Sequence, residues 1–311
     1  MASRTKDVTA GDVVALGLKG RRFDWRSYLF QGALLLSLLI SLSFLVVLLM
    51  EVIQGGLSVF TDRGTDFLEK GLSSLPQTAG VWQGLVGSFY IAIFVIVIAF
   101  PLGVAAAVYL EEYAADTRMN RFINVNIRNL AGVPAVVYGI LAVTIFVKVL
   151  RPVTGGPTLM SGGLIMAVLV LPIVIITAAE ARRAVPASIR EAGFGVGATR
   201  WEVVRSHVLP SAAPGILTGT VLSLSRALGE TAPLLLVGAI TGFLSYGGDT
   251  GPFSLLKERF TTLPTVVYDW AREPSQGFRS LTSAAIIVLL GVTLTANACA
   301  ILLRNRFERK W

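Results

Sequence analysis

The sequence predicts an all-α integral membrane protein with six transmembrane helices. Of its 311 residues, 54% are hydrophobic and 15% are charged, whereas about a quarter of the residues in a typical soluble domain are charged. Five runs without Lys, Arg, Asp or Glu are long enough to cross a bilayer, which takes about 18 to 20 apolar residues. They are residues 27–50, 81–110, 129–147, 162–179 and 280–303. A sixth run, residues 212–240, is interrupted only by Arg226 and Glu230.

The distribution of Lys and Arg predicts the orientation of these spans, because positive residues concentrate in cytoplasmic loops. Six spans place both termini on one side. The segments on that side hold eighteen Lys and Arg, and the segments on the opposite side hold eight. We therefore expect a multi-pass protein of the plasma (inner) membrane with cytoplasmic termini. It divides into a basic N-tail (residues 1–26), a transmembrane domain (27–303) and a C-tail (304–311).

The net charge of +8 is also compatible in principle with a nucleic-acid-binding protein. The basic residues, however, flank the apolar runs and do not build one interleaved basic and aromatic face. The positive charge is therefore explained by membrane topology. Lipid is an expected partner and nucleic acid is not.

A polar segment, residues 186–210, lies between the fourth and fifth expected spans. Pro186 interrupts the preceding helix, since proline lacks the N–H that continues the hydrogen-bond ladder. Ser188, followed three residues later by Glu191, fits a capping box at a helix start. The sequence therefore predicts a new short helix directly after Pro186.

Three glycines predict a bend within the polar segment. Gly193, Gly195 and Gly197 each lower helix propensity by about 1 kcal/mol relative to alanine. A second short helix can begin at Thr199, until Leu209-Pro210 ends it. Two short helices joined by a bend at the membrane surface form a shape that another protein can bind.

Arg226 and Glu230 are charged residues inside an apolar run, where each costs about 2.5–3.5 kcal/mol at a helix centre. Residues four apart lie on one helix face, so the two side chains can pair, and Arg226 must face protein or water. A guanidinium suits phosphate and other oxyanions, so Arg226 is a candidate contact for an anion in transit. Glu230 would hold Arg226 while the path is empty and release it when an anion competes. A structural pair that braces the helices is the alternative. Gly229 and Pro233 beside the pair favour a cavity.

Catalytic and metal-binding groupings are absent from the sequence. None of the six lysines follows a glycine, so the Gly-x4-Gly-Lys-Ser/Thr phosphate loop is missing and any energy from ATP must come from a partner chain. His207 is the only histidine, and Cys299, the only cysteine, belongs to another expected span. We therefore expect a non-enzymatic chain without a cofactor or metal of its own.

The polar segment resembles the EAA loop of ABC-importer permeases with the MetI-like fold. The resemblance rests on Glu191-Ala192-Gly193, on Gly197 and on His207-Val208-Leu209-Pro210 at the family's spacing. In that family the loop docks into a cleft of the ATPase subunit. The resemblance implies that role for these positions and for Arg200 and Trp201 between them. Gly193 replaces the usual alanine, and His207 replaces the usual isoleucine or valine.

A second resemblance concerns the fifth span. Ser225-Arg226-Ala227-Leu228-Gly229-Glu230-Thr231-Ala232-Pro233-Leu234-Leu235 is similar to the corresponding stretch of phosphate-importer permeases of the PstA type. Agreement extends to Tyr109-Leu110-Glu111-Glu112-Tyr113, Gly132-Val133-Pro134 and Leu302-Leu303-Arg304-Asn305, so the resemblance covers roughly residues 80 to 311. Residues 175–180 lack the arginine that related permeases often carry there, and no second basic site is assigned.

These resemblances imply a permease subunit that forms half of the path of an ATP-driven importer of inorganic phosphate. Arg226 and Glu230 would be its translocation residues. The implied partners are a second, PstC-like permease, a PstB-like ATPase dimer that binds ATP and Mg²⁺, and an external PstS-like phosphate-binding protein. Two alternatives stay open: a permease for another oxyanion, such as sulfate or molybdate, and a membrane signalling subunit that senses phosphate.

Overall fold

The computed structural model describes residues 25–239 and 254–307, and every regular element in this part of the chain is a helix. The expected N-tail therefore lies almost wholly outside the described residues, as do Ile240 and the last four residues of the C-tail. The chain divides into two units, residues 1–51 and 52–311. Helix α2 (Trp25–Arg63) begins in the first unit. Nearly all large apolar side chains of α2 within that unit are exposed. Such a helix suits a hydrocarbon surrounding.

The second unit contains the remaining helices. They are α3 (Asp66–Glu69), α4 (Trp82–Phe94), α5 (Phe100–Val108), α6 (Arg118–Ala131), α7 (Ala135–Ala142), α8 (Arg151–Thr154), α9 (Leu159–Arg183), α10 (Ala187–Gly195), α11 (Arg200–Val203), α12 (Leu209–Gly229), α13 (Ala232–Val237), α14 (Leu263–Ala271) and α15 (Gln276–Phe307). Wider π-helical turns lie at η1 (Val95–Ala99), η2 (Tyr109–Tyr113), η3 (Val143–Val149) and η4 (Val204–Val208), and a 3-10 turn at η5 (Leu255–Lys257). Within residues 25–239 and 254–307, five helices are long and apolar enough to cross a membrane, or six if one bent pair counts as a span.

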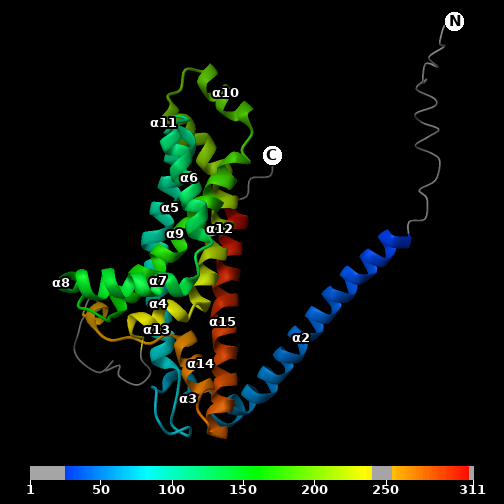
Figure 1. Ribbon diagram of the computed structural model, residues 1–311, viewed down its shortest axis with the longest axis vertical. Coiled ribbons are helices and arrows are strands. Elements are labelled where there is room, and N and C mark those ends of the chain that lie inside the picture. Colours follow the sequence, from blue (N-terminus) through cyan, green and yellow to red (C-terminus); the bar gives the residue numbers. More distant parts are fainter. Residues whose placement is uncertain (1–24, 240–253, 308–311) are drawn as a thin grey trace, which may run out of the picture. The chain divides into compact units, whose positions relative to one another are not determined.

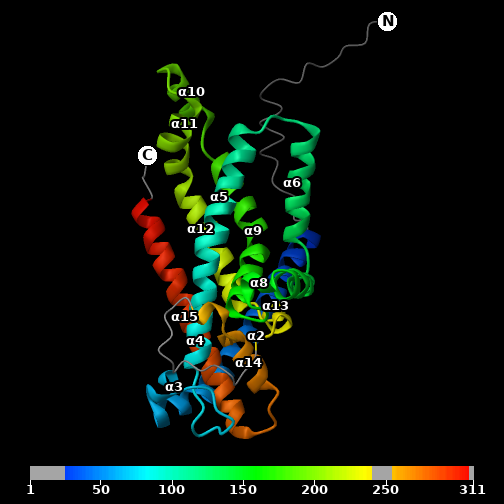
Figure 2. The same cartoon turned by 90° about the vertical axis from the view of Figure 1, so that its left-hand side faces the viewer.

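Helix α9 is the centre of the second unit. It packs against α4, α5, α6, α12 and α13, and α15 runs beside α12 on the outside (Figures 1 and 2). A helix that is apolar on every side is expected to be buried, and two thirds of the most apolar stretch of α9 is buried. Helices α10 and α11 lie at one end of this unit, and α3 and α14 lie at the opposite end.

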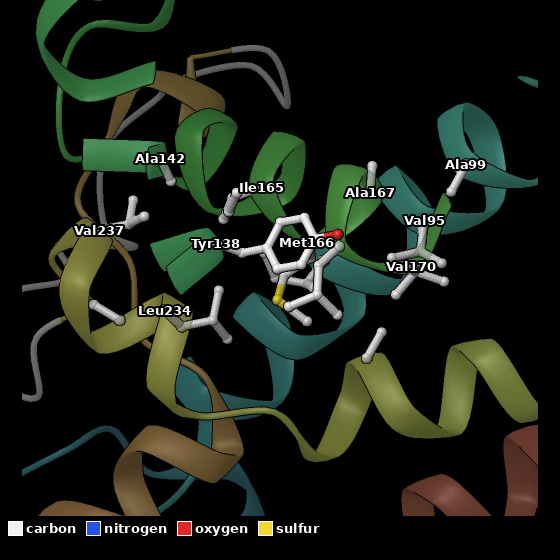
Figure 3. Close-up of a cluster of buried hydrophobic side chains, with 14 of the residues drawn as sticks. Val95, Ala99, Tyr138, Ala142, Ile165, Met166, Ala167, Val170, Leu234 and Val237 are labelled. Atoms are coloured by element: carbon white, nitrogen blue, oxygen red, sulfur yellow. The ribbon is translucent and has the colours of Figure 1, made fainter. Parts of the chain in front are cut away.

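The largest apolar cluster joins α7, α9 and α13 around the ring of Tyr138. In Figure 3 this ring lies against Met166 of α9 and close to Leu234 of α13. The Tyr138 hydroxyl donates a 2.9 Å hydrogen bond to the carbonyl oxygen of Leu130, near the end of α6. This bond satisfies a polar group that is otherwise buried, and it braces the connection between α6 and α7.

The third expected span is not one straight helix. Helix α6 ends at Ala131 and α7 begins at Ala135, with a bend of 101° between α6 and the α7–η3 helix. Pro134 explains the break, because it lacks an N–H and biases Val133 before it away from helical geometry. Beyond the bend, a Cβ on Gly139 would lie 2.9 Å from Cα of Pro233, so this glycine permits the close helix contact.

The fifth expected span is also interrupted. Helix α12 ends at Gly229, Glu230 is extended (φ −79°, ψ 127°), and α13 begins at Ala232. Pro233 lies in the first turn of α13, where a missing N–H is tolerated. The run over residues 212–240 is therefore not one continuous helix in its described part. It breaks between Gly229 and Ala232, where Gly229 and Pro233 favour a kink, and Arg226 lies in the last turn of α12.

Two other prolines lie in helices that follow π-helical turns. Pro101 and Pro210 are each the second residue of a helix that directly follows a π-helical turn, η1 and η4 respectively. The wider turn accepts the missing backbone N–H, which would otherwise interrupt the helix. The expected helix end at Leu209-Pro210 is therefore wrong, and one helix runs without a break from Arg200 to Gly229.

Candidate coupling segment and membrane charge pair

The polar segment begins with α10, which has no side-chain cap. Pro186 occupies the position before its first residue, so Ser188 lies inside the first turn and the expected capping box is not formed. A capping box is present instead at the start of α11. Thr199 N donates to Glu202 Oε2 at 2.7 Å, and Glu202 N donates to Thr199 Oγ1 at 3.3 Å. The second helix of the segment therefore has the better-defined start.

The three glycines of the polar segment have different roles. Gly197 has a φ of 81°, a left-handed conformation that glycine adopts without the usual penalty, and it makes the bend. Gly193 is buried, and a Cβ there would lie 2.8 Å from Cγ2 of Val203, so it permits α10 to cross α11. A Cβ on Gly195 would meet nothing within 4 Å. The expected bend is confirmed, and its sharp point is Gly197.

The structure brings most of the expected docking residues to the surface of the polar segment. The exposed ones are Glu191, Ala192, Gly197, Arg200, Trp201, His207 and Pro210, whereas Leu209 is half-buried. Two exposed residues at the tip were not anticipated, Phe194 and Val196, the latter 85% exposed. Their signal in the sequence is an apolar side chain on each side of a glycine in an otherwise polar stretch. Large apolar side chains that are exposed together mark protein-binding surfaces.

Arg226 and Glu230 form the expected pair. Arg226 Nε lies 3.2 Å from Glu230 Oε1. The arginine side chain is 47% exposed and the glutamate 22%, so the guanidinium keeps an open side. Its place in the last turn of α12 adds a favourable interaction with the carbonyl end of that helix. The pair, which we call the charge pair, lies at a break in a membrane helix.

A polar contact beside the charge pair was missed at the sequence level. The Ser225 hydroxyl bonds to Asn297 Oδ1 of α15 and to the Val221 carbonyl oxygen. An asparagine inside an apolar run was the available signal, since such residues join membrane helices through hydrogen bonds. This bond fixes the end of α12 against α15 next to Arg226. Among the described residues, no group of three or more His, Cys, Asp or Glu is placed to hold a metal ion.

Comparison with known proteins identifies the family. Residues 99–311 match the family of the binding-protein-dependent transport system inner membrane component. The chain belongs to this family. It is therefore a permease, a non-catalytic, multi-pass subunit of the inner membrane.

Individual proteins agree with this assignment. The chain is 30% identical to the phosphate transport system permease protein PstA of Haemophilus influenzae over 281 residues, which are 88% of this chain and 93% of that protein. The resemblance to phosphate-importer permeases of the PstA type is thereby confirmed.

Two solved structures share the fold. One is a bacterial ABC transporter involved in the import of the acidic polysaccharide alginate (TM-score 0.62, 16% identity, covering 92% of this chain and 99% of that chain). The other is an inward-facing form of the MetNI methionine ABC transporter (TM-score 0.54, 19% identity, 74% and 95%). The expected all-helical, MetI-like permease fold is confirmed.

Proposed function

We propose that this permease is a subunit of an ATP-driven importer of inorganic phosphate and forms half of its translocation path. The evidence for phosphate as the cargo is the similarity to a PstA protein, which aligns over nearly the whole of both chains. A second, PstC-like permease would form the other half of the path. A PstB-like ATPase dimer would bind ATP and Mg²⁺, and an external PstS-like protein would deliver phosphate. Both termini and the polar segment would be cytoplasmic.

The charge pair supports an anionic cargo. Transporter sites commonly form where a membrane helix is broken, and Arg226 lies at such a break with about half of its side chain exposed. A phosphate offers the same bidentate acceptor geometry as a carboxylate. An incoming phosphate would displace Glu230 from Arg226, and Glu230 would return when the path is empty.

The polar segment supports coupling to an ATPase. Its exposed tip carries Phe194, Val196 and Trp201, which are large enough to fill pockets on a partner. The helix that starts at Arg200 continues without interruption to Gly229. A movement imposed on the tip would therefore reach Arg226 through one helix.

Uptake of radiolabelled phosphate by the complete transporter in proteoliposomes tests the function and the site. Arg226→Gln should lower uptake about 10- to 150-fold, as expected for the loss of a charge-assisted bond worth about 1.5–3 kcal/mol. Arg121→Gln is the matched control, because Arg121 also pairs with a carboxylate, Asp116, but on the surface.

The same assay separates the alternatives. Excess sulfate or molybdate should compete poorly with labelled phosphate. Uptake of those anions in place of phosphate would overturn the proposed cargo. Full uptake by Arg226→Gln would refute the role of Arg226 and leave the cargo standing.

A further inference from the structure

Five charged side chains form an ion network where α5, α9 and α10 meet. Two carboxylates, Glu111 and Glu112, lie in η2, the turn that ends the helix from Trp82 to Tyr113. Arg182 and Arg183 end α9, and Arg190 belongs to α10. The carboxylates are 70 to 78 residues from their partners in sequence. The ion network therefore joins the polar segment to two membrane helices.

Each carboxylate of the ion network has more than one arginine partner. Glu111 accepts bonds from Arg182 Nη1 at 3.2 Å and from Arg183 Nε at 2.9 Å, and Arg183 Nη2 adds a second bond. Glu112 Oε1 accepts from Arg182 Nε at 2.5 Å and from Arg190 Nε at 3.2 Å. Their described bonds thus differ in one respect: Glu111 bonds to α9, whereas Glu112 bonds to both α9 and α10.

Arg190 fixes how α10 leaves α9. Its Nη1 donates to the Val185 carbonyl oxygen at 2.9 Å, and its Nη2 donates to the Arg182 carbonyl oxygen at 3.2 Å. The last carbonyl groups of a helix lack partners within that helix, so Arg190 satisfies the end of α9 while its Nε holds Glu112. The three bonds use the planar fork of an arginine, which a lysine cannot reproduce.

Four of the five side chains of the ion network are shielded from water, whereas that of Arg183 is 47% exposed. The side chains of Glu111 and Glu112 are 11% and 9% exposed, and those of Arg182 and Arg190 are 16% and 17% exposed. Such pairs lose far more when one partner is removed than surface pairs do, because the remaining charge is left without compensation. The geometry around Glu112 is therefore strongly determined.

A second contact ties the polar segment to the same turn. The guanidinium carbon of Arg200, the first residue of α11, lies 6.0 Å from the ring centroid of Tyr113, the last residue of η2, within the range of a cation–π interaction. Both helices of the polar segment thus contact η2. Single π-helical turns of this kind are frequent at functional sites.

We propose that Glu112 is a positioning residue that holds α10 through Arg190 and makes the polar segment move together with the ends of α5 and α9. This inference rests on the proposed coupling of the polar segment to an ATPase. It adds a second connection from that segment into the membrane, besides the helix that continues into α12. Without the bond to Glu112, α10 would tilt on its own and ATP hydrolysis would no longer drive the membrane helices efficiently.

The number of phosphate ions imported per ATP hydrolysed, measured with the complete transporter in proteoliposomes, tests the proposal. This ratio does not fall when protein is simply lost or unassembled, because uptake and hydrolysis then fall together. Glu112→Gln and Arg190→Lys should each lower it about 5- to 10-fold. Glu111→Gln is the matched control: it removes the same charge from the same ion network without touching α10, and should change the ratio less than 2-fold.

A distance measurement separates this proposal from the proposed function. Spin labels at Met119→Cys on α6 and Ser188→Cys on α10, in a Cys299→Ser background, report the orientation of α10 whatever the cargo. The distance distribution should broaden with Glu112→Gln and stay narrow with Glu111→Gln. An unchanged distribution, an unchanged ratio, or equal effects of the two glutamine variants would overturn the positioning role. Absence of phosphate uptake in the wild type, with the distance effect present, would overturn only the cargo.

Discussion

Replacement of Gly197 by alanine should weaken assembly with the ATPase. The residue has a φ of 81°, and an L-amino acid in the left-handed region costs about 1–2 kcal/mol. Few interactions hold the bend in this conformation against that cost. The bend is exposed, and two backbone hydrogen bonds at it run from Gly197 N to Phe194 O at 2.9 Å and from Ala198 N to Gly193 O at 3.2 Å. The fraction of molecules with a competent bend should therefore fall about 5- to 30-fold.

The apparent dissociation constant between the permease pair and the ATPase dimer, measured in nanodiscs, is the suitable assay. It should rise by the same factor for Gly197→Ala, since binding is reduced by the competent fraction. Gly195→Ala is the control two residues away: its Cβ meets open space, its φ is not positive, and alanine favours the helix by about 1 kcal/mol. Gly197→Asn should be intermediate, since asparagine tolerates this conformation better than alanine.

Unchanged affinity for Gly197→Ala would refute the reasoning, because the bend would then not be part of the docking surface. Equal loss for Gly195→Ala and Gly197→Ala would also refute it. In that case added bulk at the tip, and not backbone conformation, would control binding.

Two further predictions concern packing in the membrane. A Cβ on Gly87 would lie 1.8 Å from the Thr261 carbonyl oxygen. Gly87→Ala should therefore destabilise the protein by about 1–3 kcal/mol and lower its Tm in detergent. Gly291→Ala is the control: its Cβ would meet nothing within 4 Å, and the Tm should stay unchanged or rise. Ser225→Ala and Asn297→Leu should each lower the free energy of unfolding by about 0.6–1.7 kcal/mol, and the double variant should lower it little more than either. Fully additive losses in unfolding measurements would show that the bond between Ser225 and Asn297 contributes nothing.

The sequence was sufficient for the fold class because hydropathy over a single span is a local property. It also predicted the charge pair, since Arg226 and Glu230 are four residues apart and α12 continues up to Gly229, the residue directly before Glu230. The helix breaks were harder to locate. Pro134 and Pro210 are chemically alike, yet the chain bends by 101° at the first and continues as helix through the second. Pro210 follows a π-helical turn, whereas Pro134 follows the end of α6, and no residue pattern specifies such a turn.

Capping at the polar segment illustrates a second limit. Ser188 with Glu191 and Thr199 with Glu202 fit the same pattern of four residues, and only the second pair forms the box. The position of the helix start relative to Pro186 decides between them. A pattern alone leaves that start uncertain by one or two residues.

Long-range pairing is the third limit. Arg182 and Arg183 contributed to the sequence analysis as positive charges at a membrane surface, which is how their position beside an apolar run is ordinarily explained. Their carboxylate partners are about 70 residues away. Nothing local in the sequence connects Arg190 with Glu112, so the ion network could be found only once α5 and α9 were seen side by side.

The unbroken helix from Arg200 to Gly229 has a geometric consequence for transport. From Arg200 to Arg226 it rises about 39 Å at 1.5 Å per residue. A rigid rod of that length converts a tilt of about 5° about its Arg200 end into a displacement of roughly 3 Å at Arg226, about one hydrogen-bond length. If the helix turns as one body, a very small rotation is thus enough to make or break a single contact at its far end.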